Sequence, residues 1–218
     1  MKCDLHIHTA YSYDSEAEPN QIINAALKKK IDCIAITDHG EVKGALETID
    51  YAKEKPILII PGIEIKTKAG DMIGLNIREI IPNGLSPEET VEKIKKLGGL
   101  AVIPHPFGWC CSFKDDLEGL KNKIDAIEVF NASVFGKGNK KALAFAKNHN
   151  LAFTAGSDAH FPNFVGRAYL EIPGENLSIG EVLEKIKEKE GKVGGEGTGF
   201  GERVIDHIKR NIAKFKNY

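Results

Sequence analysis

The chain has 218 residues, of which 42% are hydrophobic and 28% are charged, and its formal net charge is −1. This length suits one domain with a large core better than two domains. The near-neutral charge gives no support to a dominant basic surface for nucleic acid, although it leaves nucleic acid possible as a partner. No apolar run approaches the ~20 residues that a membrane span needs.

The four cysteines, Cys3, Cys33, Cys110 and Cys111, show no CxxC spacing. The first residues also lack the basic and then apolar pattern of a signal peptide. Both features favour a reduced, cytoplasmic setting. The oligomeric state is not indicated by the sequence.

Apolar stretches and breaker residues predict strands and helices in alternation along the chain. The predicted strands cover 2–9, 31–37, 57–65, 72–80, 100–103, 126–131, 151–155 and 167–172, and the strand at 72–80 returns from the turn that precedes it. The predicted helices cover 19–30, 42–53, 86–97, 139–148, 178–190 and 202–216. This α/β alternation predicts a parallel sheet covered by helices, closed into a barrel, with an open doubly wound sheet as the alternative.

Two further stretches have no regular pattern. Residues 107–119 form an irregular loop with Trp109 and Phe113, which either line a substrate pocket or pack over the barrel mouth. The glycine-rich run Gly191–Gly201 has no following Lys-Ser/Thr pair, so it is not a phosphate-binding loop. We expect it to be a flexible connector or a lid.

Ionisable side chains gather where the predicted strands end, and Asp14 lies in the loop after the first strand. The residues at these ends are His6, His8, Asp38, His39, Glu64, His105, Asn131, Asp158 and His160. Taken singly, each is an ordinary surface or turn residue. Because the C-terminal strand ends of a barrel lie together, however, these groups would repel one another without a cation. The set therefore predicts a metal site.

Imidazoles and carboxylates without thiolates suit Zn²⁺, Mn²⁺ or Fe²⁺. The predicted metal-binding residues are His6, His8, Asp14, His39, Glu64, His105, Asp158 and His160. Eight side chains are too many for one ion, so we expect two or three divalent ions with Glu64 as a bridge. Bridged ions ~3.5–4 Å apart suit displacement at phosphorus and lower the pKa of a bound water.

The motifs that carry these residues resemble the PHP (polymerase and histidinol phosphatase) family from residue 2 to about residue 172. They are Asp4-Leu5-His6-Ile7-His8-Thr9, Thr37-Asp38-His39-Gly40, Pro61-Gly62-Ile63-Glu64, Pro104-His105-Pro106 and Gly156-Ser157-Asp158-Ala159-His160. The resemblance implies a distorted (β/α)7 TIM-like barrel with its metal site at the C-terminal strand ends. Residues 1–218 then form a single barrel domain, with 173–218 as a helical, glycine-rich extension packed on it.

The resemblance also assigns ligands to three ions. One ion takes His6, His8, Glu64 and Asp158; a second takes Glu64 and His105; a third takes His39, His160 and Asp14. Some family members have a histidine in place of Asp14, and some have another within the segment that matches Asp71–Asn76. Here Asp71, Asn76 or water remains to complete the second ion.

The sequence thus predicts a metal-dependent phosphoesterase, a hydrolase that acts on a small phosphomonoester or nucleotide through a metal-activated hydroxide. Glu64 and Asp158 are the predicted catalytic residues, and Arg167 is a candidate phosphate clamp because its planar fork suits phosphate oxygens. Asn131 is a candidate hydrogen-bonding residue of the site wall, and Asp38 is expected to orient a ligand histidine.

Three alternatives stay open. A 3′–5′ exonuclease or other nuclease would use the same site but would favour a basic groove. An amidohydrolase-like C–N hydrolase would favour a lysine in place of Glu64. A non-catalytic ribonucleoprotein subunit would be more basic and would not need the metal ligands.

Overall fold

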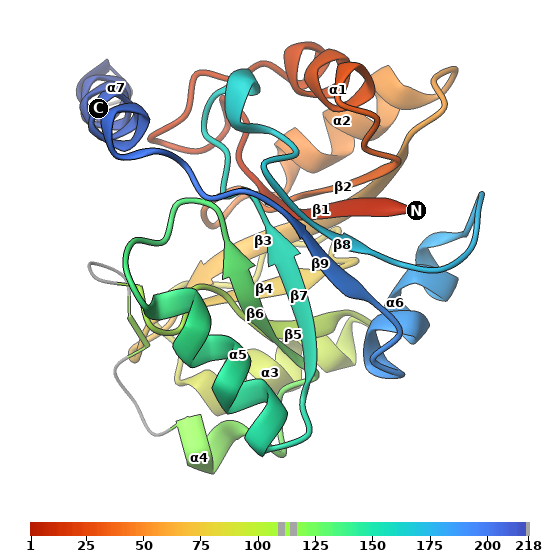
Figure 1. Ribbon diagram of the computed structural model, residues 1–218, viewed down its shortest axis with the longest axis vertical. Helices are drawn as coiled ribbons and strands as arrows, with labels where there is room; N and C mark the ends of the chain where they lie inside the picture. Colours follow the sequence, from red (N-terminus) through yellow and green to blue (C-terminus); the bar gives the residue numbers. More distant parts are fainter. Residues whose placement is uncertain (109–111, 114–116, 217–218) are drawn as a thin grey trace.

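The computed structural model describes residues 1–108, 112–113 and 117–216 (Figure 1). The strands are β1 (Lys2–Ile7), β2 (Cys33–Ile36), β3 (Leu58–Lys66), β4 (Asp71–Leu75), β5 (Leu100–Ile103), β6 (Ala126–Asn131), β7 (Ala152–Gly156), β8 (Ala168–Glu171) and β9 (Lys192–Gly195). The helices are α1 (Pro19–Lys28), α2 (Lys43–Ala52), α3 (Pro87–Lys96), α4 (Leu117–Leu120), α5 (Gly138–Asn148), α6 (Ile179–Lys187) and α7 (Phe200–Lys216), with a 3₁₀ turn at Pro162–Phe164.

The described strands form one sheet in the order β7-β6-β5-β4-β3-β2-β1-β8-β9. Strands β1 to β3 are parallel, as are β5 to β7, and β4 runs antiparallel between β3 and β5. Helices lie around the outside of this sheet (Figure 1). The structure confirms the predicted α/β barrel, distorted by the reversed strands β4 and β8.

The barrel closes at the C-terminal ends of β1 and β7. The backbone N–H of Asp158 donates to the oxygen of His6 at 2.8 Å, and that of His8 donates to the oxygen of Ala159 at 2.9 Å. At the other end of β1, the neighbouring strand is β8, which pairs Leu170 with Cys3. The sheet is therefore nearly closed, and its tightest closure lies where the metal-binding residues were predicted.

Three apolar clusters hold the layers together. One draws its members from β1 to β8 and from α6, and includes Leu5, Ile60, Val102 and Leu183. Since nearly every strand contributes to it, this cluster fills the barrel interior. The other two pack outer helices against the sheet, one around α3 and α5 and one around α1 and α2.

The glycine-rich run departs from the expected flexible connector, because residues 192–195 form β9 on the edge of β8. A Cβ at Gly194 would lie 2.3 Å from the Tyr169 ring, and one at Gly195, whose φ is +104°, would lie 2.0 Å from the oxygen of Arg167. Glycine thus permits a close pairing that larger residues would block.

The loop predicted at 107–119 contains helix α4 at its end. Phe113 is buried in the apolar cluster around α3 and α5, so it packs into the core. Trp109, Cys110 and Cys111 lie outside the described residues. Cys3 and Cys33 are buried free thiols.

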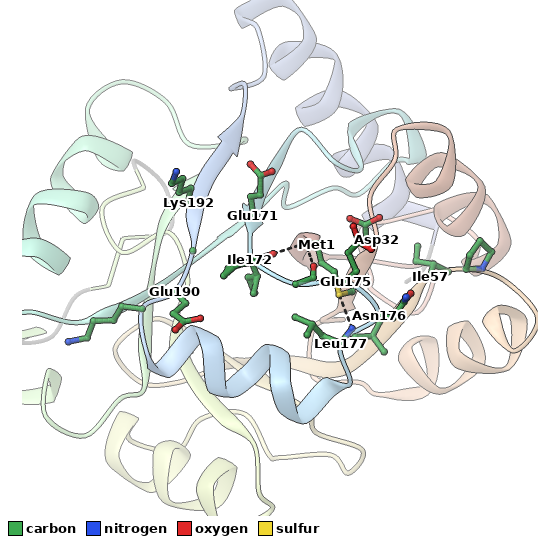
Figure 2. A pocket seen from close by; sticks show the side chains of 16 residues that line it. Met1, Asp32, Ile57, Glu171, Ile172, Glu175, Asn176, Leu177, Glu190 and Lys192 are labelled. Carbon is green, nitrogen blue, oxygen red and sulfur yellow. Dashed lines mark hydrogen bonds between the residues drawn. The ribbon is translucent and has the colours of Figure 1, made fainter.

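A cavity of about 1320 Å³ opens at the end of the barrel opposite the predicted metal site, where its lining includes Asp32, Leu58 and Ile172 (Figure 2). The amino group of Met1 donates there to the backbone oxygens of Ile172 and Gly174, at 2.6 and 3.0 Å. Within the described ranges, every helix is too short or too polar to cross a membrane.

Candidate metal centre

The structure brings all eight predicted metal-binding residues together at one end of the barrel. They come from the end of β1, the loop after it, the turns after β2, β5 and β7, and β3: His6, His8, Asp14, His39, Glu64, His105, Asp158 and His160. His39 is the most exposed member, at 23% of its side chain, and the other seven are at most 13% exposed. We call this set the eight-residue cluster.

Two imidazoles and two carboxylates meet at the end of β1 at distances typical of metal ligands. Nε2 of His6 and Nε2 of His8 lie 3.1 Å apart. Oε2 of Glu64 lies 3.5 and 3.4 Å from these two nitrogens, and Oδ1 of Asp158 lies 3.8 and 3.5 Å from them. Two ligands about 2.05 Å from a tetrahedral zinc ion are about 3.3 Å apart. These five distances are all near that value, and His6, His8 and Asp158 form a group that could hold one ion, with Glu64 next to its two imidazoles.

The other oxygen of Glu64 points to a second group. Its Oε1 lies 3.2 Å from Nε2 of His105, and His6, Glu64 and His105 form one of the groups that could hold an ion. Asp71 stands beside Glu64 on the adjacent strand, where burial and the Glu64 carboxylate raise the pKa of Asp71. With one oxygen for each group, Glu64 has the geometry of a bridging carboxylate.

A third group lies on the other side of His8. Oδ1 of Asp14 is 3.5 Å from Nε2 of His39 and 3.2 Å from Nε2 of His160. This buried oxygen makes no hydrogen bond with a described residue, so two imidazole nitrogens and a carboxylate converge without satisfying one another. Such converging acceptors fit a cation.

Hydrogen bonds on the far side of each ring select the tautomer that a metal needs. The Nδ1–H of His6 donates to Oε1 of Glu128 at 3.2 Å, and that of His160 donates to the backbone oxygen of Asp158 at 3.1 Å. The Nδ1–H of His8 donates to Oγ of Ser12 at 3.2 Å. All three rings consequently turn an unprotonated Nε2 toward the cluster.

Asp38 acts on a ligand histidine only through an intermediary. Its Oδ1 accepts from Oγ of Ser12 at 2.9 Å and from the backbone N–H of Thr9 at 2.6 Å, and Ser12 in turn meets His8. Among the described residues, Asp38 has no direct hydrogen bond to a ligand ring. The expectation that Asp38 orients a histidine is corrected to this relay.

Glu128 is a residue of the site that sequence reasoning missed. It is 2% exposed within β6, and it accepts from the His6 ring, from the backbone N–H of His105 at 2.8 Å and from Nδ2 of Asn131 at 3.0 Å. A glutamate inside an otherwise apolar strand is the signal that would have found it. Nδ2 of Asn131 also lies 3.4 Å from Oδ2 of Asp158, beside the cluster.

The carboxylates of the cluster change the proton affinity of its imidazoles. Burial opposes the protonation of His39, yet Glu64 and Asp14 raise its pKa to about 10. Burial likewise opposes the protonation of His105, and Glu64 raises its pKa to about 9. The carboxylates thus attract protons to these two imidazoles even in a dry interior, whereas burial and the neighbouring His160 and His39 lower the pKa of His8.

Two sites of backbone strain help to aim the ligands. His105 has a φ of +30° and Asp158 a φ of +53°, a region that non-glycine residues seldom adopt. Just before Asp158, a Cβ at Gly156 would lie 2.4 Å from Cβ of His6 and 3.0 Å from Oε1 of Glu128. The glycine thus lets β7 approach His6 closely.

Two other candidates lie away from the cluster. Both Nη atoms of Arg167 donate to the carboxylate of Glu202, and no described residue of the eight-residue cluster contacts its guanidinium. Asn76 follows the last residue of β4. Because β4 is antiparallel, Asp71 lies at the cluster end and Asn76 at the opposite end, so Asn76 is wrong as a candidate ligand.

Comparisons with known proteins agree with this architecture. A family model described as the PHP domain matches residues 4–188. An uncharacterised protein of Methanocaldococcus jannaschii is 46% identical over 142 residues, which cover 61% of this chain and 82% of that protein. A probable histidinol-phosphatase of Thermotoga maritima is 25% identical over 214 residues, which cover 79% of this chain and 90% of the relative.

Among solved structures, a two-domain protein of Bacteroides vulgatus that contains a predicted PHP-like metal-dependent phosphoesterase has a TM-score of 0.76. It is 20% identical, and the match covers 96% of this chain and 69% of that one. This likeness shows the fold. The family match covers far more than half of the sequence. It includes all eight predicted metal ligands. The chain belongs to the PHP domain family.

Proposed function

We propose that this protein is a metal-dependent phosphoesterase that hydrolyses a small phosphomonoester or a nucleotide. The observation that carries the proposal is the convergence of His6, His8 and Asp158 on one point, beside Glu64 and two further groups that could hold an ion. Neighbouring metal ions are suited to binding a phosphoryl group, because its charge is spread over several oxygens. Membership of the PHP domain family supports the same chemistry.

The residues present fit two or three divalent ions, and their imidazole and carboxylate donors suit Zn²⁺, Mn²⁺ or Fe²⁺. His6, His8, Glu64 and Asp158 would hold the first ion. Glu64 and His105, with Asp71 beside them, would hold the second. Asp14, His39 and His160 would hold the third. When bound, such ions act as Lewis acids on phosphoryl oxygens and make water nucleophilic at neutral pH.

The chain's own residues prepare the site for this reaction. Glu64 and Asp158 place carboxylate oxygens beside the imidazoles, where they would neutralise part of the charge of bound metal ions. Glu128, Ser12 and the backbone of Asp158 hold the Nδ1 protons of three rings, so that the Nε2 lone pairs face inward. The barrel wall buries most of these groups, which strengthens their electrostatic interaction with a phosphate.

The substrate class rests on chemistry and on one relative. The Thermotoga maritima relative is a probable histidinol-phosphatase, which acts on a small phosphorylated molecule. The near-neutral charge of this chain favours a small substrate over a long nucleic acid. We therefore expect turnover of monoesters such as nucleotides, sugar phosphates or histidinol phosphate.

The proposal is tested with His8→Ala in a phosphatase screen over nucleotides, sugar phosphates, histidinol phosphate and short oligonucleotides. The wild type, supplied with Mn²⁺ or Zn²⁺, should hydrolyse at least one monoester. His8→Ala should lose on the order of a thousandfold in kcat, because several kcal/mol of transition-state stabilisation depends on the metals. Circular dichroism should show an intact fold. Undiminished turnover by His8→Ala in metal-replete buffer would refute the proposal.

A further inference from the structure

Helix α7 carries a guanidinium to the edge of the eight-residue cluster. Nη1 of Arg210 lies 3.4 Å from Nε2 of His160 and 3.8 Å from Oδ1 of Asp158. Nη2 donates to the backbone oxygen of Asp158 at 3.1 Å and to Oγ of Ser133 at 3.3 Å. The Arg210 side chain is 19% exposed, so it stands at the boundary between the buried cluster and solvent.

Several contacts fix the position of α7. The backbone N–H of Thr198 donates to the oxygen of Ala132, just after β6, at 2.8 Å. Along the helix, Lys209 lies over the Phe161 ring, Ala213 is fully buried, and Lys214 lies over the Tyr13 ring. Figure 1 shows α7 on the side toward which β6 and β7 point. Arg210 is therefore held at the mouth of the cluster.

The contact between Arg210 and His160 has a chemical consequence. The Nδ1–H of His160 is used by the oxygen of Asp158, so Nε2 has a single lone pair. That lone pair accepts from Arg210 or binds a metal ion, but it cannot do both. If an ion occupied Nε2 of His160, Nη2 of Arg210 would keep its two acceptors. Nη1 of Arg210 would then be available to donate to a different acceptor beside that ion.

The acceptor best suited to this place is an oxygen of a phosphoryl group. Guanidinium groups bind phosphate oxygens through charge-assisted hydrogen bonds, and their rigid fork matches the spacing of two oxygens. A monoester has three terminal oxygens and a charge near −2, so it offers oxygens to the ions and one more to an arginine. A diester has one terminal oxygen fewer and half the charge.

We propose that Arg210 is a substrate-binding residue that donates to a terminal oxygen of the phosphoryl group and favours monoesters over diesters. This inference rests on the proposed function of the same site. It gives to Arg210, on α7, the clamping role that the sequence suggested for Arg167. Arg167 is instead engaged with Glu202 at the start of the same helix.

The test measures the affinity of the metal-loaded protein for inorganic phosphate by calorimetry. Arg210→Ala should weaken phosphate binding by on the order of tenfold to a hundredfold, the range of a charge-assisted contact. Arg210→Lys, which keeps the charge without the fork, should fall between Arg210→Ala and the wild type. Lys187→Ala removes one exposed positive charge from α6, which has no part in holding α7, and should stay within about twofold of the wild type.

Metal content, measured on the same samples, should be equal in Arg210→Ala and the wild type. Loss of an ion from Arg210→Ala would overturn the proposal, because Arg210 would then support the metal ligands and not the substrate. Phosphate affinity within about twofold of the wild type would overturn it as well, and so would a wild type that does not bind phosphate.

The phosphate measurement also separates this inference from the proposed function. If the wild type hydrolyses monoesters and Arg210→Ala binds phosphate as tightly as the wild type, the function stands and the role of Arg210 fails. If phosphate affinity depends on Arg210 while no phosphoester is hydrolysed, Arg210 is an anion-binding residue and the proposed function fails.

Discussion

Glu128 shows how one carboxylate organises this site at the scale of a single residue. It accepts from the ring of His6, from the backbone of His105 and from the amide of Asn131, so three donors converge on two oxygens. The charge of Glu128 raises the basicity of His6, and its position fixes the ring. A neutral amide provides one acceptor oxygen and would turn its NH₂ group against the remaining donors.

We expect Glu128→Gln to weaken metal binding by about tenfold to a hundredfold without unfolding the protein, the usual effect of losing such a partner of a ligand histidine. Competition with a chromophoric chelator measures the affinity. Glu118→Gln is the matched control, because Glu118 pairs with His149 at 2.8 Å on the outer surface. Equal metal affinities for both variants would contradict this role of Glu128.

The residues of the cluster differ in how far the sequence reveals them. His6 and His8 lie at the end of a predicted strand, and His39, His105 and His160 come soon after three others, so local pattern alone placed them at one end of the barrel. Glu128 lies inside a strand, so a search for ligands at strand ends does not find it. Arg210 reaches the site from a helix far along the chain, and only the tertiary position of α7 reveals it.

At the scale of elements, the approach of β7 to β1 positions His6. Gly156 ends β7, and a Cβ there would lie 2.4 Å from Cβ of His6 and 2.7 Å from its backbone nitrogen. These neighbours belong to the backbone and to a short, buried side chain, so they cannot move aside easily. Glycine is required at this position for close packing.

Gly156→Ala should therefore destabilise the protein by about 1–3 kcal/mol, the range for overpacking a tight core. Urea unfolding checks this, and the same variant should bind metal more weakly because His6 is displaced. Gly180→Ala is the control, since a Cβ at this exposed position of α6 meets nothing within 4 Å. That change should be neutral or stabilise by up to about 0.5 kcal/mol. A Gly156→Ala variant as stable as the wild type would exclude close packing at this point.

The order of elements was largely predictable from the sequence. The direction of strand β4 determined whether Asn76 could be a metal ligand. The helices predicted at 86–97 and 178–190 form as α3 and α6, and each begins with a capping box, at Ser86 and at Ser178. The strand at 72–80 was predicted to return from a turn, and its reversal places Asn76 far from Glu64. Strand β9 was missed because three of the five residues Gly191–Gly195 are glycines, whose pairing depends on Tyr169 and Arg167 of the neighbouring chain segment.

At the scale of the whole molecule, buried ionisable groups gather at one end of the barrel. Glu64, Asp158 and Glu128 are buried among imidazoles, and the imidazoles hold the pKa values of Glu64 and Asp158 well below their usual range despite burial. In return the pKa values of His39 and His105 rise to about 10 and about 9. Protons and metal ions therefore compete for the same centre.

This competition predicts opposite pH dependences for metal-free and metal-loaded protein. In the metal-free protein, the raised pKa values of His39 and His105 contribute stability that is complete below pH 6.5 and is lost as the pH rises to about 10. Because a tenfold change in proton affinity corresponds to about 1.4 kcal/mol, the loss should reach several kcal/mol. Metal-loaded protein should gain stabilisation over the same range, because fewer protons compete for the ligands.

Urea unfolding of chelator-treated and metal-loaded protein at pH 6.5 and pH 10 measures both slopes. His105→Gln removes one of the two imidazoles, so the pH dependence of the metal-free variant should be smaller than that of the wild type. Parallel slopes for metal-free and metal-loaded protein would contradict the account of the charge at this site.

Metal analysis of the purified protein tests the central claim most directly. The eight-residue cluster predicts two or three tightly bound ions per chain. Elemental mass spectrometry after equilibrium dialysis against Mn²⁺ or Zn²⁺ measures this number. His8→Ala should lose at least one of them, since His8 lies between the first and third groups. A wild-type chain without stoichiometric metal, or a His8→Ala chain with undiminished metal, would contradict the claim that this end of the barrel is a metal centre.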